Sequence, residues 1–120
     1  MNAHKTKTVE KPWGKFEQFT LNEETTVKLL HVKEGHRLSY QYHLLRSEFW
    51  RIVSGKVEAV LDGTRKMLRT GDSIFVPLRA KHRIEGIEDS VVLEIAYGRF
   101  DENDIVRVDD DYGRAVRPAV

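Results

Sequence analysis

Hydrophobic residues occur along the chain in short runs that favour β-strands, and a helical spacing of apolar positions is nearly absent. The runs are rich in valine, leucine, isoleucine and aromatic residues, and glycine, aspartate and serine occupy the gaps between them. Short strands separated by such turns are typical of a sandwich or a barrel. The pattern therefore predicts an all-β fold with strands at residues 25–32, 48–53, 56–61, 66–69, 73–77 and 91–100.

The sharpest turn signal is the pair Asp62 and Gly63. In KVEAVLDGTRKMLR, apolar residues stand at alternate positions on either side of this pair, as in a half-buried antiparallel hairpin. The polar residues 1–10 predict a flexible arm, and a first strand is expected just after it, in KPWGKFEQF. The segment 104–114, DIVRVDDDYGR, is compatible with a short helix or with an extended strap.

Length and charge narrow the class of protein. A chain of 120 residues is long enough for one domain with its own core. Twenty basic and 19 acidic residues give a formal charge of +1, which offers no electrostatic argument for a nucleic-acid partner or an anionic membrane. The sequence shows neither the apolar segment of a secretion signal nor a run of about 18 apolar residues, so we expect a cytoplasmic protein with no membrane partner.

Candidate chemistry gathers between two glycines, in GHRLSYQYHLLRSEFWRIVSG. Gln41 and His43 are two residues apart, so on a strand their side chains project to the same face. Glu48 lies after a bend, in the next predicted strand, at a position whose side chain is expected to face the same side. A lone histidine in a strand is more often a packed or surface residue than a ligand, so this block by itself does not establish a metal site.

A second block, GDSIFVPLRAKHRIEG, raises the case for a metal, because a turn, a short apolar strand, a proline turn and His82 follow one another. Imidazole nitrogen combined with amide and carboxylate oxygen suits a borderline divalent ion. The chain has no cysteine, which excludes a thiolate site. The residues therefore predict one divalent metal ion held by Gln41, His43, Glu48 and His82; we expect Zn²⁺, with Mn²⁺, Fe²⁺, Ni²⁺ and Co²⁺ as alternatives.

These two blocks resemble the paired metal-binding motifs of the cupin superfamily. Five segments carry a narrower resemblance: KPWGKFE, VKLLHVKEGHRLSYQYH, RSEFWRIVSG, KHRIEG and DENDIVRVDDDYGR. Together they cover nearly the whole chain and resemble type II phosphomannose isomerases. The resemblance implies a single-domain cupin fold, a jelly-roll barrel or double-stranded β-helix, over residues 11–120. In that family the domain usually follows a mannose-1-phosphate guanylyltransferase domain, and we expect a stand-alone form here.

The resemblance implies the interconversion of mannose 6-phosphate and fructose 6-phosphate. A base must take the C2 proton, and a metal acting as a Lewis acid would stabilise the enediolate. The base is left open: Lys28 and Lys81 are candidates by position, and a lysine desolvated beside a metal could lose its proton near neutral pH. Catalytic roles are therefore expected for Lys28 and Arg46.

Recognition of the sugar phosphate calls for fixed positive donors. Arg46 stands two residues before Glu48 and so belongs near the pocket rim. The resemblance adds Lys81, Tyr112 and Arg114 as substrate-binding candidates, whereas Arg83 should face away from His82 on a regular strand. Trp13 and Trp50 could stack on a sugar, although large aromatic residues in strands are more often part of a core.

Some residues depart from the family pattern. Leu44, Leu45 and Phe49 stand where relatives carry polar residues, and Arg79 and Gly86 replace a glycine and an asparagine. These departures keep two alternatives open: a sugar-binding cupin without catalysis, and, by analogy of fold alone, an iron-dependent oxygenase. Exposed sheet edges also favour a homodimer.

Overall fold

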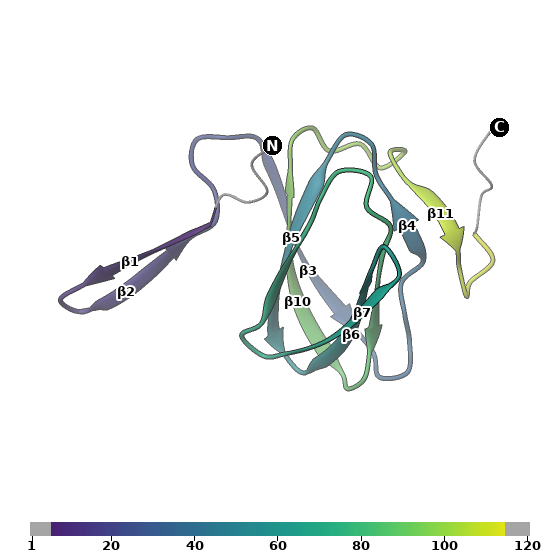
Figure 1. Cartoon of the computed structure of the whole chain (residues 1–120), viewed down its shortest axis with the longest axis horizontal. Coiled ribbons are helices and arrows are strands. Elements are labelled where there is room, and N and C mark those ends of the chain that lie inside the picture. The colour runs from purple at the N-terminus through teal and green to yellow at the C-terminus, as the bar shows by residue number, and fades with distance from the viewer. Residues whose placement is uncertain (1–5, 115–120) are drawn as a thin grey trace.

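The computed structural model describes residues 6–114, and every regular element among them is a strand (Figure 1). No helix capable of crossing a membrane is found in this part of the chain. The strands are β1 Lys7–Lys11, β2 Gly14–Gln18, β3 Thr25–Val32, β4 Tyr40–Tyr42, β5 Ser47–Ser54, β6 Lys56–Leu61, β7 Thr64–Arg69, β8 Ser73–Val76, β9 His82–Gly86, β10 Ser90–Tyr97 and β11 Val106–Asp109. The predicted all-β class is confirmed.

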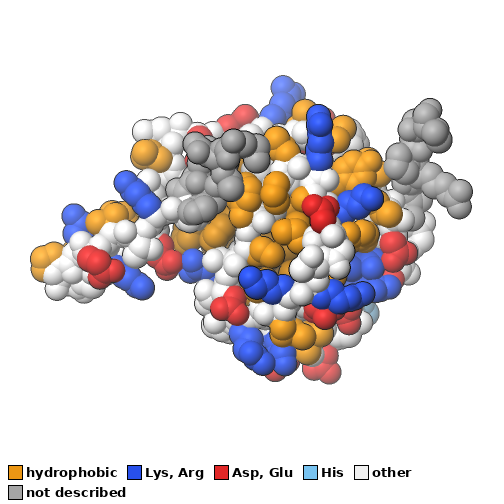
Figure 2. Space-filling model, in the orientation of Figure 1, with side chains coloured by type: hydrophobic (Ala, Val, Ile, Leu, Met, Phe, Trp, Pro, Cys, Tyr) orange, Lys and Arg blue, Asp and Glu red, His pale blue; other side chains and the backbone are white. Residues whose placement is uncertain are grey.

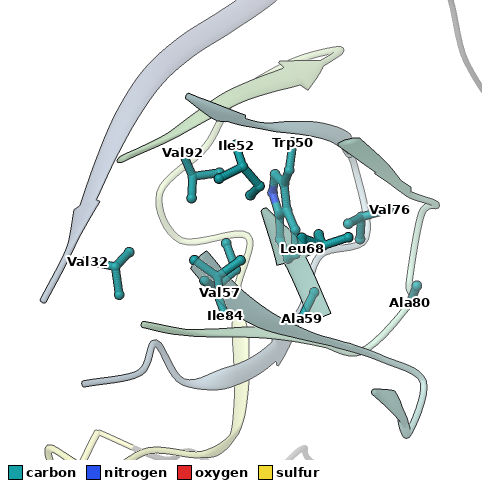
Figure 3. Packing of buried hydrophobic residues seen from close by; sticks show 10 residues of the cluster. All are labelled: Val32, Trp50, Ile52, Val57, Ala59, Leu68, Val76, Ala80, Ile84 and Val92. Atoms are coloured by element: carbon teal, nitrogen blue, oxygen red, sulfur yellow. The ribbon is translucent and has the colours of Figure 1, made fainter. Parts of the chain in front are cut away.

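Two antiparallel sheets form the body of the molecule. One sheet has the strand order β3-β10-β5-β8 and the other the order β11-β4-β9-β6-β7. Their inner faces pack on each other, because the main cluster of buried hydrophobic residues takes Trp50, Ile52 and Val92 from the first sheet and Val57 and Ile84 from the second (Figure 3). Side chains from alternate positions of each strand thus fill the barrel.

The hairpin predicted at Asp62 and Gly63 is confirmed. Strands β6 and β7 pair from Lys56 opposite Arg69 to Leu61 opposite Thr64, and both turn residues have positive φ, 46° and 83°. Positive φ at both central positions is the geometry whose twist suits a two-residue hairpin. The alternation along β6 follows: Val57 and Ala59 are buried, whereas Glu58 is only half-buried.

The N-terminal segment is more ordered than its composition suggested. Strand β1 pairs with β2 in full register, so the arm expected over residues 1–10 is a strand from Lys7 onward, and residues 1–5 lie outside the described part. The hairpin stands away from the barrel in Figure 1, and Figure 2 shows both charged and hydrophobic side chains on it. At its base the Arg51 guanidinium forms an ion pair with Glu17 at 2.9 Å.

The segment 104–114 is extended rather than helical. Strand β11 pairs with β4, with Arg107 opposite Gln41. A turn follows, in which Arg114 donates to the Asp110 carboxylate at 2.9 Å. The pairing of β11 with β4 places the inner face of β11 beside Gln41, the first candidate ligand.

Candidate metal centre

Three of the four predicted ligands meet inside the barrel. His43 directly follows β4, Glu48 lies near the start of β5, and His82 begins β9. All three are buried, and one ligand atom from each lies within 4.8 Å of the others. Nε2 of His43 is 3.2 Å from Oε2 of Glu48, and Nε2 of His82 is 3.6 Å from Oε1 of the same carboxylate. The sheets thus bring together residues that are distant in sequence.

Backbone carbonyls fix the orientation of both imidazoles. Nδ1 of His43 donates to the carbonyl of Asp104 at 2.7 Å, and Nδ1 of His82 donates to that of Ala80 at 2.8 Å. A carbonyl can only accept, so in each neutral ring the lone pair is on Nε2, the atom that faces Glu48. Nε2 of His82 is buried without a hydrogen-bond partner in the described part of the chain. A metal ion would satisfy this buried nitrogen.

Gln41 is close to this group but turned differently. Its Nε2 lies 3.3 Å from Nε2 of His43, and its Oε1 accepts a hydrogen bond from the Ser39 hydroxyl. A half-turn of the amide would point the oxygen toward the imidazoles, and the Ser39 hydroxyl would then accept from the nitrogen. Gln41 can therefore serve as a fourth ligand after this rotation.

The surroundings favour the protonation states that a cation requires. Burial opposes ionisation of Glu48, but a hydrogen bond from His43 and the positive charges of His82 and His43, when these imidazoles are protonated, together with the charge of Arg46, outweigh it and lower the pKa of Glu48 to about 2. Burial lowers the pKa of His82, which favours the neutral imidazole. The indole of Trp50 also donates to Glu48 at 3.1 Å. An ionised carboxylate beside neutral imidazoles is a suitable set for a divalent ion.

Glu48 and Gln41 also line a pocket of about 440 Å³. Its walls include three cationic side chains, Lys28, Arg46 and Arg107, and three acidic ones, Glu48, Glu94 and Glu102. The sequence did not single out Glu94 or Arg107. Nε of Arg107 is buried without a hydrogen-bond partner among the described residues, and only 8% of the surface of Glu94 is exposed. Both side chains line the pocket, where a bound molecule could contact them.

The two predicted catalytic residues line this pocket but differ in environment. Arg46 is buried; its Nε lies 3.4 Å from Glu48 and its guanidinium stacks 4.3 Å from the centre of the Phe100 ring. Lys28 is exposed, with Nζ 4.3 Å from the same ring centre. The structure thus leaves Lys28 exposed rather than enclosed beside the metal ligands, and its role as a base stays a prediction.

Three predicted substrate-binding residues are not among those that line the pocket. Lys81 is exposed and precedes the inward-facing His82, so its side chain takes the opposite face. The Tyr112 hydroxyl hydrogen-bonds Nδ1 of His36 at 2.9 Å, and both Tyr112 and Arg114 line a separate hollow near the start of β4. The structure therefore does not bring Lys81, Tyr112 and Arg114 together at this pocket, and their role in substrate binding stays a prediction.

The departures from the family pattern lie outside the pocket. Leu44 and Leu45 are 49% and 58% exposed, and Phe49 packs on the outer side of its sheet with Ile95 and Tyr97. Trp50 belongs to the core, as its strand position suggested, whereas Trp13 is exposed at the tip of the N-terminal hairpin. None of the three substituted positions alters the walls of the pocket.

Comparison with known proteins supports the sequence resemblance. The family described as mannose-6-phosphate isomerase C-terminal matches residues 1–110. Mannose-1-phosphate guanylyltransferase ManC of Salmonella typhimurium is 37% identical over 92% of this chain, and alginate biosynthesis protein AlgA of Pseudomonas aeruginosa is 34% identical over 93%. In both cases the chain spans 24% of the relative, about a quarter of the length of these curated proteins.

Solved structures with low sequence identity share the fold. KdgF from Halomonas sp. superposes with a TM-score of 0.61 at 20% identity, over 71% of this chain and 78% of that one. Salicylate 1,2-dioxygenase from Pseudoaminobacter salicylatoxidans gives a TM-score of 0.59 at 14% identity, over 61% of this chain and 21% of that one. The barrel described above is a cupin fold, as the sequence predicted.

Proposed function

Because the chain belongs to the family of mannose-6-phosphate isomerase C-terminal domains, we propose that it is a metal-dependent isomerase of mannose 6-phosphate and fructose 6-phosphate. The observation that carries the proposal is the buried group of His43, Glu48 and His82, whose Glu48 also lines a pocket that contains the cationic side chains of Lys28, Arg46 and Arg107. Such a site provides ligands for a cation and room for a sugar phosphate beside it.

The protein's own groups would orient the reaction. A divalent ion, when bound by His43, Glu48 and His82, supplies Lewis-acid stabilisation of the negative charge that develops on the substrate oxygens. Zn²⁺ is our proposed ion, since imidazole and carboxylate ligands suit it. The Asp104 and Ala80 carbonyls hold both imidazoles in the required tautomer. Arg46 compensates part of the negative charge of Glu48 from within the pocket.

Arg107 is the proposed anchor for the phosphate. Its position opposite Gln41 places it on the inward side of β11, and its unpartnered Nε has a donor to offer. Guanidinium groups bind phosphate through charge-assisted hydrogen bonds. Lys28, on the facing sheet, adds a second positive charge to the same pocket. A phosphorylated sugar does not cross membranes unaided, so a cytoplasmic location is part of this proposal.

We also propose that two chains form a homodimer. A two-stranded hairpin has marginal stability on its own, yet β1 and β2 project from the barrel with Trp13 72% exposed. Val27 and Leu29, on the outer face of β3, are 58% and 55% exposed and offer an apolar surface for the hairpin of a second copy. Sedimentation equilibrium should show a dimer that Trp13→Ser weakens; a monomeric wild-type protein would contradict this assembly.

The isomerase proposal is tested with protein freed of metal by a chelator and reloaded with Zn²⁺, Mn²⁺, Fe²⁺, Ni²⁺ or Co²⁺ in turn. Nuclear magnetic resonance should show conversion of mannose 6-phosphate to fructose 6-phosphate, and Glu48→Gln should abolish it. Binding of the sugar phosphate without conversion for every metal would instead indicate a binding module. Oxygen consumption by the Fe²⁺ protein would indicate an oxygenase, and either result would overturn the proposal.

A further inference from the structure

Glu94 is a buried carboxylic acid that the metal centre does not use. It lies in the middle of β10, on the inward face, with Lys28 opposite on β3 and Trp50 opposite on β5. Only 8% of its surface is exposed, and within residues 6–114 its carboxylate has neither a hydrogen bond nor a salt bridge. Burial of such a group without a partner opposes folding. A structural role does not explain its presence.

The position of Glu94 in the pocket explains better why a carboxyl group is present there. The side chain lines the pocket that Glu48 and Arg46 also line. The charged and titratable groups that act on it from the surrounding strands are Glu48, Lys28, Arg46 and His43. Burial, together with the charge of Glu48, raises the pKa of Glu94 to about 7, while the cations oppose this rise. A carboxyl group with this pKa can both accept and release a proton near neutral pH.

We propose that Glu94 is the general base that carries the proton between C2 and C1 of the substrate. This inference rests on the proposed isomerase function. In the open-chain aldose, Glu94 takes the C2 proton as the C2–H bond breaks. The electron pair of that bond forms the C1–C2 double bond, and the carbonyl electrons move to O1. Glu94 then returns the proton to C1, while the hydroxyl proton passes from O2 to O1. Atoms and charge balance without an external oxidant or reductant.

Other groups in the pocket are less suited to this step. The Glu48 carboxylate accepts hydrogen bonds from Trp50 and Arg46 and faces both imidazoles. Lys28 is exposed, and its ammonium group lies against the face of the Phe100 ring. Glu102 lines the pocket from an exposed loop position after β10. Glu94 is thus the buried carboxyl group in the pocket that is not committed to other side chains.

The test compares metal-loaded wild-type protein with Glu94→Gln, which preserves side-chain size. Glu85→Gln is the matched control, since Glu85 is half-buried on β9 but lines a hollow on the outer side of its sheet. The main measurement is the uptake of solvent deuterium at C1 and C2 of the two hexose phosphates. Loss of a general base should slow this exchange by about 10²–10⁴-fold. Metal content and mannose 6-phosphate affinity should stay within about threefold of wild type.

Each outcome has a distinct meaning. Slowed exchange with retained metal and sugar-phosphate binding supports Glu94 as the base, provided that Glu85→Gln exchanges like wild type. Exchange in Glu94→Gln within about tenfold of wild type would overturn this inference but leave the isomerase function intact. Loss of metal or of substrate binding in Glu94→Gln would show a structural role and also overturn it. A wild-type protein that catalyses no exchange would overturn the isomerase function, and this inference with it.

Discussion

The two ends of the barrel interior differ in chemistry although the same strands build both. On β9 the inward face carries His82 at one end and Ile84 two residues later, and on β5 it carries Glu48 and then Ile52. The same change occurs on β10 from Glu94 to Val92 and on β3 from Lys28 to Val32. One end is therefore a charged pocket, whereas the other is an aliphatic core (Figure 3).

This difference separates stability from chemistry. Burial of aliphatic side chains such as Ile84 and Val92 favours folding, because it removes apolar surface from water. Burial of charged or polar groups such as Glu48, Glu94 and Arg46 carries a desolvation penalty that their mutual attraction only partly offsets. Retention of so many polar groups at one end indicates that function, rather than stability, determines that end. Substitutions at the aliphatic end should consequently lower stability, whereas those at the charged end should alter binding and chemistry.

The largest effect on stability is expected at the aliphatic end. Ile84→Ala should lower the free energy of unfolding by about 2–5 kcal/mol, because Ile84 is fully buried and a cavity would remain. Urea denaturation measures this loss, with the exposed Val27→Ala as a control. The number of metal ions bound per folded chain should not change. A variant that stays stable but loses its metal would contradict the separation of the two ends.

At the charged end, Glu94→Gln should stabilise the metal-free protein above neutral pH. The pKa of Glu94 is raised from 4.5 to about 7, so the native state binds more protons than the unfolded state between these values, and wild-type stability falls as pH rises through this range. The glutamine variant escapes a penalty on the order of 3 kcal/mol at most. The free energies of unfolding of wild type and Glu94→Gln should therefore differ more at pH 8 than at pH 5, and denaturation at both pH values measures this. The same difference in stability at both pH values would show that Glu94 does not titrate in this way.

Arg107→Met should weaken binding of mannose 6-phosphate by about 10–100-fold, the value of one hydrogen bond to a charged group. Binding of mannose itself should change little, because the lost contact is to the phosphate. Calorimetry with both sugars measures the difference, and Arg65→Met, on an exposed side chain of β7, is the control. Equal losses for mannose and mannose 6-phosphate would argue against Arg107 as the phosphate anchor.

The smallest effect concerns Arg79, which lies beside the charged end and has a φ of 67°. The left-handed conformation costs an L-residue about 1–2 kcal/mol, and glycine avoids this cost at an entropic loss of about 0.5–1 kcal/mol. Arg79→Gly should therefore raise the free energy of unfolding by about 0.5–1 kcal/mol in thermal or urea denaturation. The backbone hydrogen bond from Arg79 to the His43 carbonyl, 2.9 Å long, remains available. A loss of stability would show that the arginine side chain contributes to the fold.

Much of the barrel could be predicted from local patterns. Alternating apolar residues predicted β6 and β7, and the Asp62–Gly63 turn fixed their register. The same period of two predicted Gln41 and His43 on one face, where their side chains approach each other, with Glu48 close to His43. It would also have excluded Lys81, because a residue next to an inward-facing histidine faces outward.

Glu94 and Arg107 were missed because their roles depend on pairing between distant strands. The sequence VVLEIAY shows one acidic residue in an apolar strand, and only the register of β10 with β3 and β5 directs it into the pocket. Arg107 lies in a segment whose composition did not distinguish helix from strand. Its place beside Gln41 follows from the pairing of β11 with β4, which no local pattern indicates.

The most direct test of the metal centre is a calorimetric titration of metal-free protein with Zn²⁺, for wild type and for His82→Asn. We predict one ion per wild-type chain. Loss of a residue that only hydrogen-bonds a metal ligand lowers metal affinity by roughly 10–100-fold. His82→Asn removes a ligand itself, so its affinity for Zn²⁺ should fall by more than this. A wild-type protein that binds no ion, or a His82→Asn variant that binds as tightly as wild type, would contradict the account.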